Sequence, residues 1–69
     1  MMTKQQIEEY LFNKVEEQVL KVQTALNNVV ISLSNHDWKT ASEGHRQVDY
    51  WLSRVKNTQR LIDELEDLE

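Results

Sequence analysis

The chain has 69 residues and no cysteine, which limits it to one small domain and excludes both disulfides and a thiolate zinc site. Twelve acidic and eight basic residues give a formal net charge of -4, which argues against nucleic acid as the primary partner. A chain of this size rarely obtains more than about 3 to 5 kcal/mol from a single core. We therefore expect association to contribute to its stability.

The first predicted element is a helix over residues 4–34. Thr3 and Gln6 form a capping-box pattern, which favours a helix start at this point. Residues 27–32 are rich in asparagine and β-branched residues, so a strand is an alternative there. Helix is favoured because the apolar spacing continues through the segment and no second strand is present to pair with it. The apolar stripe steps alternately by three and four residues and consists of Phe12, Val15, Val19, Val22, Leu26, Val29 and Leu33.

A short polar break at residues 34–37 separates this helix from a second one, predicted over 38–67. Asp37 is the preferred N-cap, with Ser34 as the alternative, and residues 35–37 then form the turn. Gly44 is expected to permit close approach of the two helices rather than to bind phosphate. The second stripe consists of Trp38, Ala41, His45, Val48, Leu52, Val55, Gln59 and Ile62.

The two stripes predict an all-α fold, in which residues 1–69 form one antiparallel two-helix hairpin. A single hairpin without an internal repeat excludes a solenoid. The apolar stripes are too wide for one partner helix, so we expect two hairpins to pack as a homodimeric four-helix bundle. The residues expected to carry self-association are Val19, Leu26, Val48, Leu52, Val55 and Ile62.

Aromatic residues supply further candidates for contact with other proteins. Trp38, at the start of the second helix, is expected to bury its ring against the end of the first. Trp51 lies off the stripe, where it suits either an oligomer interface or a partner surface. The candidate partner surface is Leu20, Tyr50 and Trp51.

The two histidines do not predict a metal site. His36 lies in the turn, and His45 shares a helix face with Asp49, but neither belongs to a Glu-x-x-His pair or a His-Glu-x-x-His motif. If His45 lies in a dimer seam, its protonation at roughly pH 6 is expected to weaken association. No nucleophile–base set or glycine-rich phosphate loop is present, so we expect no enzymatic activity and no cofactor.

Basic residues in the middle of the second helix suggest an alternative function, the binding of nucleic acid. They could contact phosphates, but a solvated helix face is the favoured explanation, because the chain is acidic and has no recognition helix. The acidic residues that follow oppose the helix dipole at its C-terminal end. The candidate phosphate contacts are Arg46, Arg54, Lys56 and Arg60.

These observations favour a small non-enzymatic protein–protein interaction module, an adaptor, inhibitor or regulator that acts as a homodimeric helical bundle. The alternatives are a nucleic-acid-associated regulator and a structural component of a larger assembly. The N-terminal residues contain no apolar core of a signal peptide, and no run of eighteen apolar residues occurs, so we expect no membrane contact and a cytoplasmic location.

Overall fold

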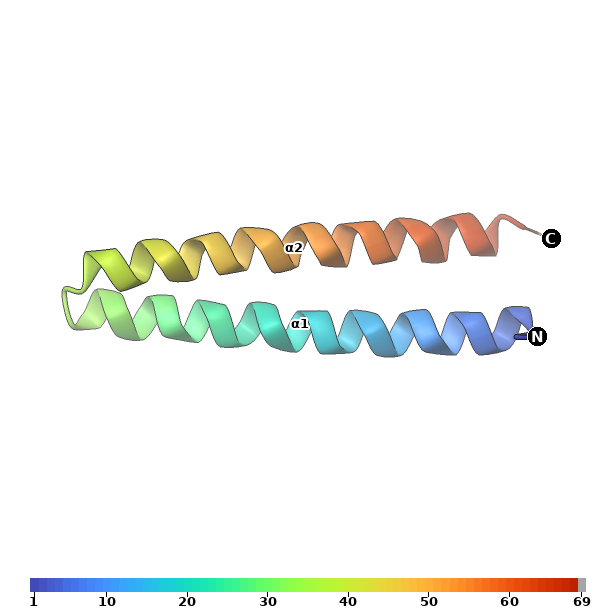
Figure 1. Ribbon diagram of the computed structural model, residues 1–69, viewed down its shortest axis with the longest axis horizontal. Coiled ribbons are helices and arrows are strands. Elements are labelled where there is room, and N and C mark those ends of the chain that lie inside the picture. Colours follow the sequence, from blue (N-terminus) through green and yellow to red (C-terminus); the bar gives the residue numbers. More distant parts are fainter. Residues whose placement is uncertain (69) are drawn as a thin grey trace.

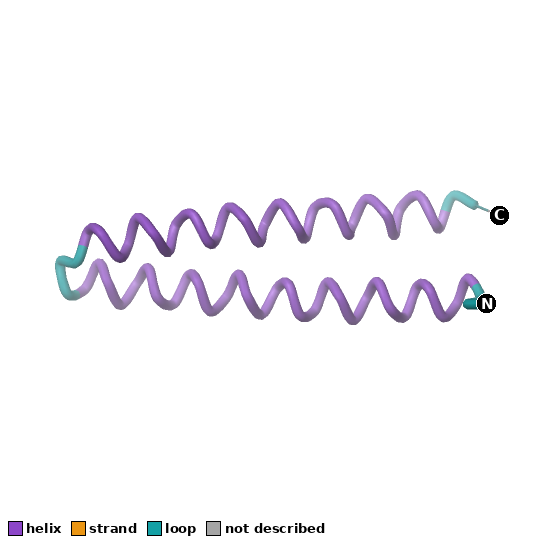
Figure 2. The backbone as a smooth tube through the Cα atoms, in the orientation of Figure 1, coloured by secondary structure: helices purple, strands orange, loops and turns teal. Residues whose placement is uncertain are grey.

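The computed structural model describes residues 1–68 as two long helices, α1 (Lys4–Ser34) and α2 (Trp38–Glu66). The helices run antiparallel and pack side by side, as Figure 1 and Figure 2 show. The hairpin measures 51 × 15 × 15 Å. Both termini lie at one end, where Lys4 Nζ donates a hydrogen bond to the carbonyl oxygen of Leu68 over 3.3 Å. The predicted all-α helical hairpin is therefore confirmed.

The start of α1 follows from the predicted capping box. The Gln6 N–H donates to Thr3 Oγ1 over 3.2 Å, and the Thr3 N–H donates to Gln6 Oε1 over 2.9 Å. These reciprocal bonds satisfy two backbone donors that the first helical turn leaves free. The helix then continues without interruption through residues 27–32, so the helical prediction for this segment is correct.

The turn of residues 35–37 reverses the chain through a left-handed residue. His36 has a φ of 58°, and the Asp37 N–H donates to the carbonyl oxygen of Ser32 over 2.8 Å. Asp37 then caps α2, because its Oδ1 accepts a hydrogen bond from the Thr40 N–H over 3.1 Å. The prediction of Asp37 as the N-cap is confirmed.

An inner seam joins the two helices along their length. Its residues recur at alternating steps of three and four, the spacing of an antiparallel coiled coil. All of them are buried or half-buried, and Ile62 is the least exposed at 2 %. The inner seam consists of Leu11, Val15, Gln18, Val22, Ala25, Val29 and Ser32 on α1, and of Ala41, Gly44, Val48, Trp51, Val55, Thr58, Ile62 and Leu65 on α2.

The inner seam corrects half of each predicted stripe. The row of Val15, Val22 and Val29 and the row from Ala41 to Ile62 do lie in the seam, whereas the other row of each stripe is exposed in the single hairpin. Relative to the predicted stripes, each helix is rotated by one position of the seven-residue repeat. This rotation brings small and polar side chains into the seam and leaves larger apolar side chains in solvent. The predicted stripe residues that are exposed are Phe12, Val19, Leu26 and Leu33 on α1, and Trp38, His45, Leu52 and Gln59 on α2.

Close approach at Gly44 explains this rotation. A Cβ added to Gly44 would lie 2.7 Å from Val29 Cγ2 and 3.7 Å from the backbone oxygen of Ala25. The buried neighbours Ala25 and Ala41 are also small. Helices that meet through such residues can bring their backbones together, which a row of leucine and phenylalanine would prevent. The expectation that Gly44 permits close approach is confirmed.

We predict that Gly44→Ala destabilises the hairpin by about 1 to 2 kcal/mol. The new methyl group overlaps Val29, whose branched side chain is stiff in a helix, and this cost exceeds the gain of about 1 kcal/mol in helix propensity. Urea unfolding followed by circular dichroism measures the change. In a Val29→Ala background the overlap disappears, so the same Gly44→Ala change should stabilise the protein. Stabilisation in both backgrounds would contradict close packing at this position.

The cap of α2 makes a second prediction. Hydrogen bonding from Thr40, first from its side-chain hydroxyl and second from its backbone N–H, lowers the pKa of Asp37 below its ordinary value of 3.8. The folded state thus favours the carboxylate, and this contribution to stability is complete above pH 3.8 and is lost as the pH falls through the folded pKa. Asp37→Asn keeps a capping oxygen without this titration. Below about pH 4, the urea midpoint of the wild type should therefore fall more than that of the variant. If the two midpoints fall in parallel with pH, Asp37 does not stabilise the helix start through its charge.

Candidate interaction surfaces

An outer apolar row runs along one face of the hairpin. Its α1 members lie seven residues apart, so they share one side of the helix, directly beside the inner seam. Each side chain is more than two-fifths exposed, from 42 % at Leu52 to 63 % at Trp38. The outer apolar row consists of Phe12, Val19, Leu26 and Leu33 on α1, with Trp38 and Leu52 on α2.

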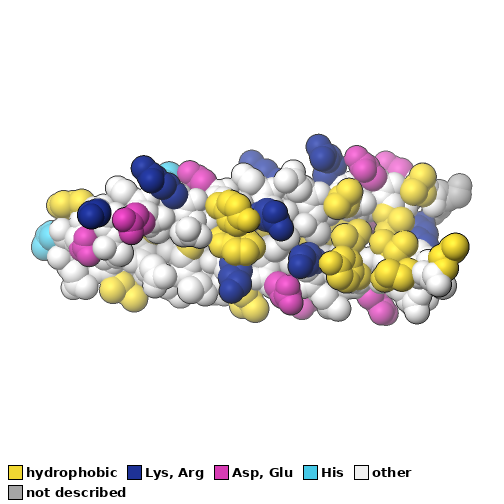
Figure 3. All heavy atoms as spheres, in the orientation of Figure 1, with side chains coloured by type: hydrophobic (Ala, Val, Ile, Leu, Met, Phe, Trp, Pro, Cys, Tyr) yellow, Lys and Arg dark blue, Asp and Glu magenta, His cyan; other side chains and the backbone are white. Residues whose placement is uncertain are grey.

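A polar groove runs along the opposite face, on the other side of the inner seam. Residues from both helices line its connected hollows, one of which has a volume of about 240 Å³. Three cations and two carboxylates, Glu17 and Glu43, lie along it. Figure 3 shows Lys and Arg side chains gathered at mid-length over both helices on one face. The polar groove is defined by Lys14, Lys21 and Asn28 on α1 and by Gln47, Trp51 and Arg54 on α2.

These two surfaces face in opposite directions because of their positions in the repeat. On α1, Lys14 and Lys21 lie on one side of the seam row, whereas Val19 and Leu26 lie on the other. On α2, Arg54 and the outer apolar residue Leu52 are separated in the same way. Since Lys14 and Arg54 line the same hollow, the apolar residues of both helices share the far face.

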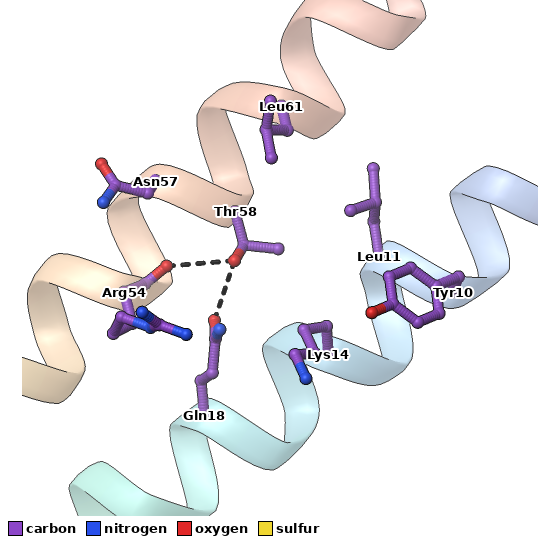
Figure 4. Close-up of a pocket in the computed structure, with 8 residues that line it drawn as sticks. All are labelled: Tyr10, Leu11, Lys14, Gln18, Arg54, Asn57, Thr58 and Leu61. Carbon is purple, nitrogen blue, oxygen red and sulfur yellow. Dashed lines mark hydrogen bonds between the residues drawn. The ribbon is translucent and has the colours of Figure 1, made fainter.

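A buried polar pair forms the floor of the groove. Thr58 Oγ1 lies 3.0 Å from Gln18 Oε1 and 3.0 Å from the carbonyl oxygen of Arg54, and these two oxygens share its single hydroxyl hydrogen. Figure 4 shows this arrangement, with Tyr10, Leu11, Lys14, Asn57 and Leu61 around it. Gln18 is 4 % and Thr58 7 % exposed, so the pair is held between the helices rather than in solvent. A buried polar pair of this kind favours one register of the two helices.

The residues predicted for self-association divide between the seam and the outer surface. Val48 and Ile62 are buried between the two helices, and Val55 is half-buried there. Val19, Leu26 and Leu52 are exposed in the outer apolar row. Only the second group is accessible to another molecule in the single hairpin.

The predictions for the tryptophans are corrected by their exposure. Trp38 does not bury its ring against α1: it is 63 % exposed, and its ring meets that of His36 edge to face at 6.0 Å. The left-handed turn at His36 leaves Trp38 at the rim of the hairpin end. Trp51, in contrast, belongs to the inner seam and forms a wall of the polar groove.

The predicted partner surface is divided in the structure. Tyr50 and Trp51 pack edge to face, with ring centroids 5.1 Å apart, on the groove side. Leu20 lies on the other side of the hairpin, where it lines a shallow hollow with Val19 and Glu16. The structure therefore does not bring Leu20 together with the two aromatic residues.

The four predicted phosphate contacts also do not form one patch. Arg54 lies in the polar groove, where its guanidinium stands 5.8 Å from the centroid of the Tyr50 ring. Lys56 lies on the side of α2 that carries Leu52, and Arg60 Nε lies 4.0 Å from Glu64 Oε1 on the exposed surface. Arg46, six residues before Leu52, is exposed. Two other cations, Lys14 and Lys21, do lie in the groove with Arg54. They were not predicted from the sequence, although their spacing of seven residues indicates that they share one side of α1.

The histidine environment is simple. His45 Nδ1 lies 3.5 Å from Asp49 Oδ2, and both side chains are largely exposed. Among residues 1–68, no three His, Asp or Glu side chains cluster closely enough to hold a metal ion. Neither helix, over its described length, is apolar enough to cross a bilayer.

Comparison of the chain with models of protein families, with curated proteins and with solved structures finds no match.

The polar pair leads to a prediction about stability. Thr58→Val keeps the shape of the side chain but leaves Gln18 Oε1 buried without a donor, so we expect a loss of about 1 to 3 kcal/mol in the free energy of unfolding. The control is Thr24→Val, because the exposed Thr24 hydroxyl makes the same type of bond, to the carbonyl oxygen of Leu20. It should cost less than about 0.5 kcal/mol. Urea unfolding measures both, and equal losses would show that the Gln18 contact is unimportant.

Proposed function

We propose that this chain is a small non-enzymatic interaction module that pairs with a second copy through the outer apolar row and forms a four-helix bundle. The observation that carries the proposal is the exposure of four large apolar side chains of this row on α1, together with Trp38 and Leu52 on α2. Among the described apolar residues only Ala25, Ala41, Val48 and Ile62 are buried, and two of these are alanines. The hairpin thus keeps little apolar surface inside and presents more of it outside.

The position of the row supports pairing between hairpins. The row flanks the inner seam directly on both helices, so a second hairpin laid on this face would place the two outer apolar rows at the centre of a four-helix core, with the seam of each hairpin beside it. Val55, which is half-buried in the single hairpin, would then lie next to the shared core. Burial of a row of large apolar side chains is the main stabilising contribution in such bundles.

The bundle would keep the polar groove on its outer surface. The three cations Lys14, Lys21 and Arg54 outnumber the carboxylates of Glu17 and Glu43 there, although the whole chain is acidic. Trp51 adds a half-buried aromatic wall. We propose that another protein binds at this groove through an acidic segment, which gives the pair the role of an adaptor or regulator in the cytoplasm.

We expect Leu26→Lys to raise the dissociation constant of the dimer at least tenfold, because it places a charge in the centre of the outer apolar row. Asn28→Lys is the matched control. It introduces the same residue on the same helix, but in the polar groove, and should leave association unchanged. Sedimentation equilibrium over a concentration series measures both variants and the wild type.

A monomeric wild type, or equal weakening by both variants, would contradict the proposal. Growth of the wild type beyond a dimer would instead favour the structural-assembly alternative. Salt-dependent binding of DNA or RNA that is lost when Arg46, Arg54, Lys56 and Arg60 are reversed in charge would favour the nucleic-acid alternative.

A further inference from the structure

We infer that one hollow of the polar groove binds a carboxylate of the partner protein, with a large apolar side chain of the same segment beside it. This inference rests on the proposed use of the groove and names the chemistry that the groove recognises. The hollow has a volume of about 240 Å³ and is lined by residues of both helices. This anion hollow is defined by Lys14, Gln18, Arg54 and Thr58 at its polar end and by Tyr10 and Leu61 at its apolar end.

The charges that line the anion hollow are not balanced within the hairpin. Lys14 and Arg54 line it from the two helices, and no Asp or Glu side chain of residues 1–68 does. Neither cation forms an ion pair with a carboxylate of this part of the chain. Glu17 lines the adjacent hollow, but it does so together with the same two cations and with Lys21, and Glu43 lines a separate hollow toward the turn. An anion in the hollow is therefore attracted by two cations that the hairpin leaves unpaired.

These two cations are also partly held in place. Lys14 is half-buried, whereas every other Lys and Arg residue of the chain is exposed. The Arg54 guanidinium stands 5.8 Å from the centroid of the Tyr50 ring, within the range of a cation–π contact. Because part of each side chain is already packed, less conformational entropy is lost when it binds a ligand than a free surface lysine or arginine would lose.

The floor of the anion hollow supplies a hydrogen-bond donor. Gln18 is 4 % exposed, and its Oε1 lies 3.0 Å from Thr58 Oγ1. Its amide nitrogen donates to no acceptor among residues 1–68. Since no fully enclosed side-chain nitrogen in this part of the chain lacks a partner, Nε2 must reach the open space of the hollow. A carboxylate oxygen bound there accepts from Nε2 and lies beside Lys14 and Arg54.

The other end of the anion hollow is apolar and open to solvent. Tyr10 is 55 % and Leu61 48 % exposed, and Figure 4 shows both away from Gln18 and Arg54. Neither belongs to the outer apolar row, so the pairing of two hairpins does not cover them. An apolar side chain of the partner buries both. The adjacent hollow, lined by Lys21, extends the site along the groove, so the ligand is a protein segment in which Asp or Glu adjoins a large apolar residue.

Two small probes test this chemistry. Phenylpropionate joins a carboxylate to an apolar ring, and phenylpropanamide has the same shape without the charge. Titration of phenylpropionate into the isotope-labelled protein should give saturable NMR shifts at the side-chain amide of Gln18, with a dissociation constant on the order of millimolar for so small a ligand. The amide should bind about fivefold more weakly or less tightly still. Equal binding of the two probes, the absence of shifts at Gln18, or tighter binding of inorganic phosphate would overturn the inference.

Three variants assign the binding to its residues. Lys14→Met keeps a side chain of similar length without the charge, so the dissociation constant of phenylpropionate should rise about threefold to tenfold. Lys56→Met, the matched control, removes a cation from the side of α2 that carries Leu52 and should leave this constant unchanged. Leu61→Ala should weaken both probes by the same factor, because it removes apolar contact and no charge.

The same variants separate this inference from the proposed function. Lys14 and Leu61 lie outside the outer apolar row, so both variants should form dimers as the wild type does in sedimentation equilibrium. Unchanged phenylpropionate binding by Lys14→Met, or an equal loss in Lys56→Met, would overturn the anion hollow while the dimer persists. A monomeric wild type would instead overturn the proposed function.

Discussion

Gly44 leaves no room for a side chain between the two helices, and the arrangement of the hairpin depends on this contact. A methyl group there would lie 2.7 Å from Val29 Cγ2. Ala25 and Ala41 are buried in the same inner seam. Close packing through small residues sets the rotation of each helix about its own axis. Once that rotation is set, the position of every other side chain follows from the helical repeat.

The same rotation determines which surfaces the hairpin offers. It turns Phe12, Val19 and Leu26 out of the seam and into solvent on one face. On the opposite face it opens a groove beside the buried pair of Gln18 and Thr58, with cations along its walls. One face carries the outer apolar row, which suits association. The other combines cations with exposed Tyr10, Tyr50 and Leu61, which suits recognition of a different surface. The proposed bundle uses both faces without requiring either helix to change its packing.

Local features were predictable from the sequence because they depend on neighbouring residues. The Thr3 and Gln6 capping box, the Asp37 cap and the helical course of residues 27–32 all follow from short-range hydrogen bonding and apolar spacing. The rotation of the helices was not predictable in the same way. Two adjacent rows on each helix satisfy the seven-residue repeat, and hydrophobicity alone selects the row with Leu26 rather than the row with Ala25. The choice between these rows depends on backbone approach at Gly44, which is a property of two helices together.

This rotation also explains why the candidate surfaces were predicted only in part. Trp38 was expected to be buried and is 63 % exposed, whereas Trp51, expected off the stripe, is half-buried in the inner seam and lines the groove. The basic groove was missed because Lys14 and Lys21 join Arg54 only across the seam. The helical repeat indicates which residues of one helix share a face, whereas the groove is built from residues of both helices.

We propose that the inner seam alone does not stabilise the fold and that a second copy completes it through the outer apolar row. The most direct measurement is the thermal unfolding midpoint of the unmodified chain at concentrations that differ a hundredfold. If folding is coupled to pairing, the midpoint rises with concentration, because mass action favours the dimer. A midpoint that does not change with concentration, together with a particle mass of 8.2 kDa throughout, would show a self-sufficient monomeric hairpin and contradict the claim.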